Sequence, residues 1–213
     1  MTTPNDSRDF YPTPDNLAWE MAYSLQSTKY GWKHLPQPIL EPSAGDGALA
    51  RQIHAIAEIR HDPKTGELDR YSTSKAKEFD LDCVELSSDF RAKLKKDGFR
   101  VVHDDFLTFR PAKKYAAIIM DPPSYGRGPK GEIWKIEESV YPLIKLCAQL
   151  LTDKPLFFLV NSYTTGLQPA VLRYMIATAL EKYDGTVTAD EIGLPVSSNG
   201  LVLPCGASGR WEI

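Results

Sequence analysis

The segment Glu41–Gly47 combines two carboxylates with two glycines, a composition suited to binding a small cationic ligand. Its glycines permit a sharp turn and a close approach of the backbone to a ligand, since a Cβ there would clash. A dinucleotide-binding turn has the spacing GxGxxG, and Ala50 makes the Gly/Ala variant formally possible. A pyrophosphate at this turn would be repelled by a nearby carboxylate. A ligand that carries an amine or another cation fits Glu41 and Asp46 better.

Further acidic residues follow two predicted strands. Glu85, near the end of a strand over 79–86, can accept two hydrogen bonds from a ribose diol. Asp105, just after a strand over 99–103, can accept from an adenine amino group, with Phe106 packing against the ring. Asp104 is the competing candidate for that role.

The run Asp121–Tyr125, Asp-Pro-Pro-Ser-Tyr, directly follows an apolar strand over 116–120. Two prolines at a strand exit stop the strand and fix the backbone. An aspartate held rigidly in that place can accept hydrogen bonds from a substrate amino group or take a proton. The glycine-rich loop 125–131 is locally basic, and Arg127 and Lys130 are candidates to hold substrate phosphates or to close as part of a lid.

The elements that must position these residues alternate between short apolar runs and longer amphipathic ones, which predicts a parallel sheet covered by helices. We expect one α/β domain over 1–213, with a mostly parallel seven-stranded sheet and helices on both faces. A helical segment within 1–35 has Thr13 as its cap, and 61–78 forms an exposed loop insert. The expected strands are 38–41, 79–86, 99–103, 116–120, 156–160, 186–192 and 200–204. The expected helices are 14–30, a helix after the glycine loop that runs to about residue 60, and 88–97, 132–151 and 168–182.

Composition narrows the class of protein. The chain has 213 residues, is 42% hydrophobic, and carries a net charge of -3. No apolar run approaches the roughly 20 residues that a membrane span needs, and the polar N-terminus lacks a signal-peptide pattern, so we expect a cytoplasmic protein. Three scattered cysteines and four histidines without ligand spacing predict neither a disulfide framework nor a metal site.

Together these motifs resemble those of class I S-adenosylmethionine (SAM)-dependent methyltransferases over nearly the whole chain. The resemblance implies a Rossmann-like fold with SAM as cofactor. It implies that the glycine loop binds the methionine part of SAM, the acid after strand two the ribose, and the acid after strand three the adenine. The implied cofactor residues are Tyr11, Pro12, Thr13, Glu41, Ser43, Ala44, Gly45, Asp46, Gly47, Glu85, Leu86, Asp105, Phe106 and Asp121. The implied catalytic residues are Asp121, Pro122, Pro123, Ser124 and Tyr125.

The two halves of the chain resemble different subfamilies. Residues 10–50 are similar to N6-adenine-type DNA methyltransferases, in which a Phe/Tyr-x-Thr-Pro segment also touches SAM. Residues 115–211 are similar to a bacterial family related to rRNA cytosine-C5 methyltransferases. The resemblance thus implies a nucleic-acid base, in RNA or DNA, as the substrate.

The substrate chemistry stays open at the level of sequence. Ser124 occupies the place where adenine-N6 enzymes carry the aromatic residue, and Tyr125 comes one residue later. Cytosine-C5 chemistry needs a cysteine nucleophile, for which Cys205, after the predicted last strand, is the candidate. The alternatives are a protein or small-molecule methyltransferase, or a catalytically silent SAM-binding subunit that acts through a protein partner.

Overall fold

The fold belongs to the α/β class, as predicted, with seven strands in a mostly parallel sheet and a separate two-stranded sheet. The computed structural model describes residues 13, 15–23, 37–58, 80–127, 131, 133–164 and 166–213. Residue contacts group the chain into two compact units, which we call the N-terminal unit (residues 12–109) and the C-terminal unit (residues 110–213). Each is described by itself.

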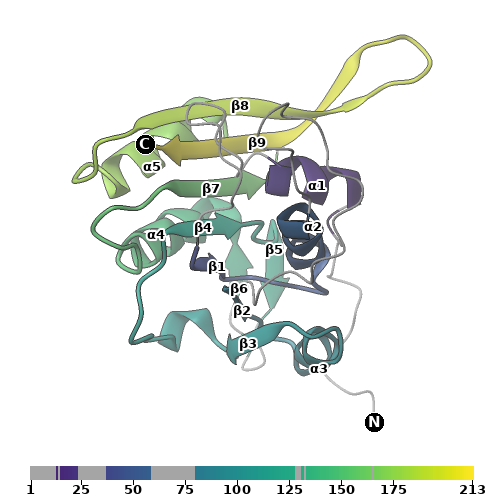
Figure 1. The fold of residues 1–213 in the computed structure, drawn as a ribbon. Helices are drawn as coiled ribbons and strands as arrows, with labels where there is room; N and C mark the ends of the chain where they lie inside the picture. Colours follow the sequence, from purple (N-terminus) through teal and green to yellow (C-terminus); the bar gives the residue numbers. More distant parts are fainter. Residues whose placement is uncertain are drawn as a thin grey trace, which may run out of the picture. The chain divides into compact units, whose positions relative to one another are not determined.

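The N-terminal unit has three parallel strands in the order β3-β2-β1 (Figure 1). They are β1 (Ile39–Glu41), β2 (Leu81–Val84) and β3 (Arg100–His103). Its helices are α1 (Asp15–Tyr23), α2 (Ala48–Glu58) and α3 (Ser88–Lys96), with a 3-10 helix at Phe106–Thr108. All residues of β1 and β2 are buried, as expected for inner strands of a parallel sheet.

Local sequence signals explain the helices of this unit. In α2, Leu49, Ile53 and Ile56 recur at helical spacing and are all buried. The side chain of Ser87 caps α3 by accepting from the Phe90 amide, and Gly98 follows the helix with a φ of 90°. These signals place the ends of α3 within one residue of the prediction.

The C-terminal unit has four strands in the order β4-β7-β9-β8. They are β4 (Ala117–Met120), β7 (Phe157–Ser162), β8 (Thr186–Pro195) and β9 (Val202–Glu212). The first two are parallel, whereas β9 pairs antiparallel with both β7 and β8. The helices are α4 (Ile136–Ala148) and α5 (Pro169–Ala179), and α5 packs on β8 and β9.

The predicted last strand, 200–204, was wrong in its length, because β9 runs from Val202 to Glu212. Glycines beyond residue 204 weaken the local strand signal, but close packing requires them. A Cβ on Gly206 would collide with the carbonyl oxygen of Ser162, and one on Gly209 would lie 2.5 Å from Ile176 of α5. Cys205 therefore lies inside β9 and does not follow the last strand.

The β8–β9 pair continues beyond its neighbour β7. The pairing of β7 with β9 ends at Ser162 opposite Ala207, whereas β8 and β9 stay paired as far as Pro195 opposite Val202. Figure 1 shows this extension, which we call the ribbon, projecting past the end of β7.

The expected glycine-rich loop 125–131 and the start of the expected helix 132–151 were also wrong. Strand β5 (Tyr125–Arg127) pairs antiparallel with β6 (Ile133–Lys135), and α4 begins only at Ile136. The apolar spacing from Ile133 onward suggested a helix, but strand pairing with 125–127 takes residues 133–135 out of it. In the same way, β7 includes Asn161 and Ser162, which were expected to lie beyond the strand.

Candidate functional site

The glycine loop between β1 and α2 has the backbone conformation that its glycines predict. Gly45 and Gly47 have φ values of 53° and 89°, a region that other residues rarely adopt. A Cβ on Gly47 would lie 2.8 Å from Leu94 Cδ2 of α3. Both glycines are therefore required for this turn, and Gly47 also for packing.

Four backbone N–H groups, three in this loop and one at the start of α2, are bonded within the protein. The amide of Ala44 donates to Val84 O (3.0 Å), that of Gly45 to Glu85 Oε2 (2.7 Å), and that of Gly47 to Ala44 O (2.9 Å). The amide of Ala48, at the start of α2, donates to Asp46 Oδ1 (3.2 Å). A phosphate-binding loop points such groups at its ligand, so this loop is not built to cradle a phosphate.

Glu85 holds the glycine loop through its carboxylate. Oε2 accepts from Gly45 and Oε1 accepts from the Ser87 amide (2.7 Å). Burial raises the pKa of the Glu85 carboxyl above its ordinary value, against these hydrogen bonds and the Arg91 charge, which lower it. Each carboxylate oxygen has a second lone pair, which leaves acceptor capacity for a hydroxyl pair such as a ribose diol.

Three other predicted residues of the loop differ in their surroundings. Glu41, at the end of β1, is 2% exposed. The hydroxyl oxygen of Ser43 is buried and has no hydrogen-bond partner in the described structure. Asp46 lies 3.5 Å from the Arg51 guanidinium and caps α2, so its charge is balanced within the protein. The two carboxylates thus differ in their surroundings, since Glu41 is buried at the end of β1 and Asp46 is ion-paired at the start of α2.

The residues after β3 form a compact turn. Asp105 Oδ1 accepts from the Leu107 amide (2.9 Å) and caps the 3-10 helix, and Asp104 Oδ1 accepts from the Asp105 amide (2.9 Å). The ring of Phe106 lies 6.3 Å from that of Phe109. Asp105 thus has one carboxylate oxygen in the turn and the other available to a ligand.

In the C-terminal unit, three hydrogen bonds hold the Asp-Pro-Pro-Ser turn. Ser124 Oγ donates to Tyr163 O (2.8 Å), the Trp134 indole N–H donates to Pro123 O (2.6 Å), and the Ile136 amide donates to Ser124 O (3.0 Å). The side chain of Trp134 therefore anchors the turn through its indole N–H. The turn is fixed from β7, from β6 and from the start of α4.

The end of β7 adds polar groups that sequence reasoning did not assign to the site. Asn161 and Ser162 are 1% and 0% exposed, yet Asn161 Oδ1 and Ser162 Oγ have no hydrogen-bond partner in the described structure. Asn161 Nδ2 lies 3.4 Å from the Tyr163 hydroxyl. Burial, and next the negative charge of Asp121, raise the pKa of Tyr163. The signal in the sequence was a polar pair ending the apolar run Phe-Phe-Leu-Val.

For the remaining predicted site residues, the structure gives less detail. Tyr11, Pro12 and Lys130 lie outside the described residues, and Arg127 is described only as the last residue of β5. The side chain of Leu86 is 51% exposed. Cys205 Sγ donates to Ile192 O (3.3 Å) within the ribbon.

Within the described ranges, no helix is both long enough and apolar enough to span a membrane. The same residues contain no group of three or more His, Cys, Asp or Glu side chains that could hold a metal ion.

No protein-family model matches the sequence, and no curated protein sequence matches it. Solved structures do resemble it. A SAM-dependent methyltransferase from Agrobacterium tumefaciens superposes with a TM-score of 0.66 at 18% identity, over 94% of this chain and 63% of that one. A proposed RNA methyltransferase from Pyrococcus horikoshii superposes with a TM-score of 0.56 at 17% identity, over 99% of this chain and 89% of that one. A proposed class I SAM-dependent methyltransferase from Listeria monocytogenes superposes with a TM-score of 0.58 at 16% identity, over 94% of this chain and 60% of that one.

These likenesses establish the fold. The chain has the Rossmann-like α/β fold seen in class I SAM-dependent methyltransferases. It spans 63% of the Agrobacterium protein and 60% of the Listeria protein. The resemblance of each half to one subfamily remains a prediction from the motifs.

Proposed function

We propose that this chain is a SAM-dependent methyltransferase that modifies an exocyclic amino group of a nucleic-acid base. The observation that carries the proposal is the anchored Asp121–Tyr125 turn at the exit of the buried strand β4. Such a turn presents a carboxylate and a proline carbonyl in fixed positions, and both can accept hydrogens from an amino group. The proposed RNA methyltransferase among the similar structures agrees with a nucleic-acid substrate.

The N-terminal unit fits SAM better than a dinucleotide. Four of its amides are already bonded, as a ligand without phosphate permits, and the buried hydroxyl of Ser43 in the loop has no partner among the described residues. Glu41 would attract the positive charges of the ligand, and Glu85 would accept from its ribose. Asp105 would accept from its adenine amino group. When bound, SAM supplies a methyl group on a positively charged sulfur.

The C-terminal unit would hold the accepting base. Asp121 and the Pro122 carbonyl would accept the two amino hydrogens and so fix the direction of the nitrogen lone pair. Asn161 Oδ1 and Ser162 Oγ offer further buried polar contacts. In-line methyl transfer needs little covalent chemistry from the protein, so positioning would supply most of the rate.

Cytosine-C5 methylation is the less favoured chemistry. It requires a free thiolate as nucleophile, whereas the Cys205 thiol donates to the Ile192 carbonyl in the ribbon. The other two cysteines, Cys83 and Cys147, are buried, and burial is the main cause that raises the pKa of each thiol. The structure thus offers an amino-group acceptor more readily than a thiolate.

The test is incubation of the protein with methyl-labelled SAM and separate pools of DNA, RNA and protein, followed by digestion and identification of the labelled product. Asp121→Ala should abolish labelling, while calorimetry shows that SAM still binds with an affinity reduced at most by the loss of one contact. Asp153→Ala, at an exposed loop residue, is the matched control and should label normally.

Each outcome is informative. Label on an amino nitrogen of a base supports the proposal. Label on cytosine C5, lost in Cys205→Ser, would assign the chemistry to the thiol. Label in the protein pool alone would overturn the nucleic-acid substrate. Bound SAM with no label in any pool would indicate a subunit that acts through a partner.

A further inference from the structure

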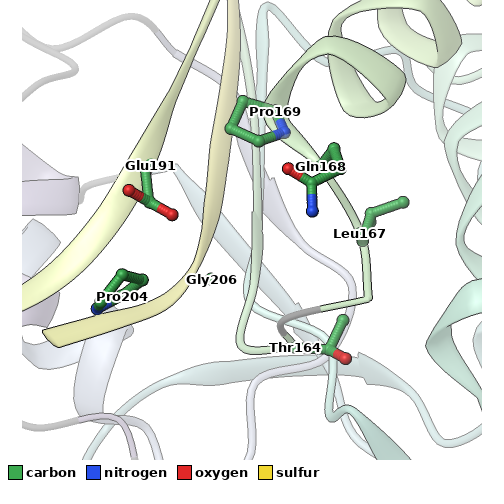
Figure 2. Close-up of a pocket in the computed structure, with 7 residues that line it drawn as sticks. All are labelled: Thr164, Leu167, Gln168, Pro169, Glu191, Pro204 and Gly206. Atoms are coloured by element: carbon green, nitrogen blue, oxygen red, sulfur yellow. The ribbon is translucent and has the colours of Figure 1, made fainter.

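A small cavity lies in the C-terminal unit between the ribbon and the loop that joins β7 to α5 (Figure 2). Its volume is about 50 Å³. The loop side and the ribbon side both contribute lining residues: Thr164, Leu167, Gln168, Pro169, Glu191, Pro204 and Gly206. One water needs about 10–15 Å³ of such space, so the cavity has room for only a few water-sized groups. It therefore suits the polar edge of a larger group better than a whole ligand.

The cavity adjoins the proposed substrate site along the chain. Thr164 follows Tyr163 directly, and the Tyr163 carbonyl accepts the hydrogen bond from Ser124 that anchors the Asp-Pro-Pro-Ser turn. On the other side, Gly206 is so close to β7 that a Cβ on it would collide with the Ser162 carbonyl. A ligand in the cavity would therefore lie beside the end of β7.

The polar side chains that line the cavity are one carboxylate, one amide and one hydroxyl, from Glu191, Gln168 and Thr164. Within the described structure, the Glu191 carboxylate has no salt bridge or hydrogen bond, and Gln168 makes no side-chain cap to α5. Figure 2 shows the Gln168 amide beside the β8–β9 pair, with its oxygen on the side of these strands, and Glu191 on β8. Thr164 Oγ1 is already bonded, since it accepts from the Gly166 amide and donates to Glu137.

None of the seven described lining residues is basic, so the cavity is unsuited to a phosphate. Leu167, Pro169 and Pro204 are apolar and can contact the faces of a flat ring. A carboxylate beside such walls favours a planar group with two adjacent N–H donors. Among the nucleobases, guanine alone presents this pair, at N1 and the 2-amino group. Adenine and cytosine place a ring acceptor next to their amino group, and a carboxylate would repel it.

We propose that this cavity, the ribbon pocket, binds the edge of an unpaired guanine that flanks the modified base. The Glu191 carboxylate accepts from N1–H and the 2-amino group, and Gln168 donates to O6. This inference rests on the proposed function, which it deepens by assigning a flanking-base preference to a single-stranded nucleic acid. No covalent step is involved.

The test compares two labelled single-stranded RNA decamers of uridine, one with a central guanosine and one with a central inosine, which lacks only the 2-amino group. Fluorescence anisotropy measures their binding to the full chain, with and without SAM. We expect the guanosine decamer to bind at least about 5-fold more tightly, from the value of a paired base contact. Glu191→Gln should remove this preference. Asp190→Asn is the matched control, because Asp190 is the preceding residue of β8 and does not line the cavity.

A guanosine preference that is lost in Glu191→Gln and kept in Asp190→Asn supports the ribbon pocket. Equal binding of both decamers, a preference unchanged in Glu191→Gln, or no binding of either decamer would overturn it. Competition by an arginine-rich peptide that depends on Glu191, without a guanosine preference, would assign the cavity to a protein ligand. The labelling assay with methyl-labelled SAM tests the proposed function separately. Label in nucleic acid together with no guanosine preference would refute the ribbon pocket and still support the proposed function.

Discussion

Replacing Glu85 by alanine is expected to weaken both the fold of the N-terminal unit and its cofactor site. The change removes the acceptor of two backbone N–H groups, those of Gly45 and Ser87, each 2.7 Å from a carboxylate oxygen. A buried N–H that loses its acceptor costs about 1–3 kcal/mol, which sets an upper range of about 2–6 kcal/mol for both. The Ser87 amide can regain water at the start of α3, and removing a partly buried charge returns part of the desolvation cost. We therefore expect a net loss of about 2–3 kcal/mol in the free energy of unfolding.

The assay is equilibrium unfolding in urea, followed by far-UV circular dichroism. Glu138→Ala is the control, because Glu138 is exposed and its ion pair among the described residues is a surface one with Lys135, so its loss should cost less than about 1 kcal/mol. SAM affinity, measured by calorimetry below the unfolding transition, should fall in the Glu85 variant and remain unchanged in the control. An equal, small loss of stability in both variants would refute the view that Glu85 holds the glycine loop.

Three further predictions follow from the same geometry. Burial raises the pKa of Glu85 in the folded protein above 4.5, so protonation of this carboxyl stabilises the fold as pH falls through that pKa. SAM affinity should decrease over the same pH range, because ribose binding needs the charged carboxylate. Calorimetry across this range should show the decrease in affinity in the wild type and not in Glu85→Gln. Gly47→Ala should lower the free energy of unfolding by about 1–2 kcal/mol because of its positive φ, and by a further amount because its Cβ would contact Leu94. Urea unfolding should therefore show Gly47→Ala to be less stable than Gly98→Ala, since Gly98 has a φ of 90° but open space around it. Equal losses of stability would argue against the packing role of Gly47. Iodoacetamide should label Cys205 in the native protein, with the two buried cysteines labelled only after unfolding, as mass spectrometry of the peptides would show.

Sequence reasoning succeeded where the signal is local. The apolar runs of β1, β2 and β4 are short and bounded by turn residues, and each lies where it was expected. The Ser87 cap and Gly98 mark the ends of α3 in the same way. The glycine loop was recognised from seven consecutive residues, and the positive φ of both glycines follows from their lack of a side chain.

The errors fall where pairing between distant residues decides the structure. No local pattern shows that residues 133–135 pair with 125–127, so the apolar spacing suggested a helix there. Gly206 and Gly209 resemble loop residues, yet close contacts with β7 and α5 require a residue without a side chain at each. Asn161 was predicted to follow the strand, because it is polar. It belongs to β7 because it pairs with β9, and that partner lies about 50 residues away along the chain.

The amides of the glycine loop bear most directly on which ligand it selects. A loop of this sequence can bind a phosphate only if its N–H groups point outward, and the Glu85 side chain, together with Val84 O, Ala44 O and Asp46 Oδ1, accepts four of them. Releasing them for a pyrophosphate would break those bonds and bring an anion towards the buried carboxylate of Glu41. Both costs disappear for a ligand that is cationic and has no phosphate. Glu85 would therefore have two roles, since its carboxylate holds the Gly45 amide and is also the predicted acceptor for the ribose. For this reason Glu85→Gln, with one carboxylate oxygen replaced by an amide nitrogen, should weaken SAM binding without producing affinity for NAD, which a binding titration with both ligands would measure.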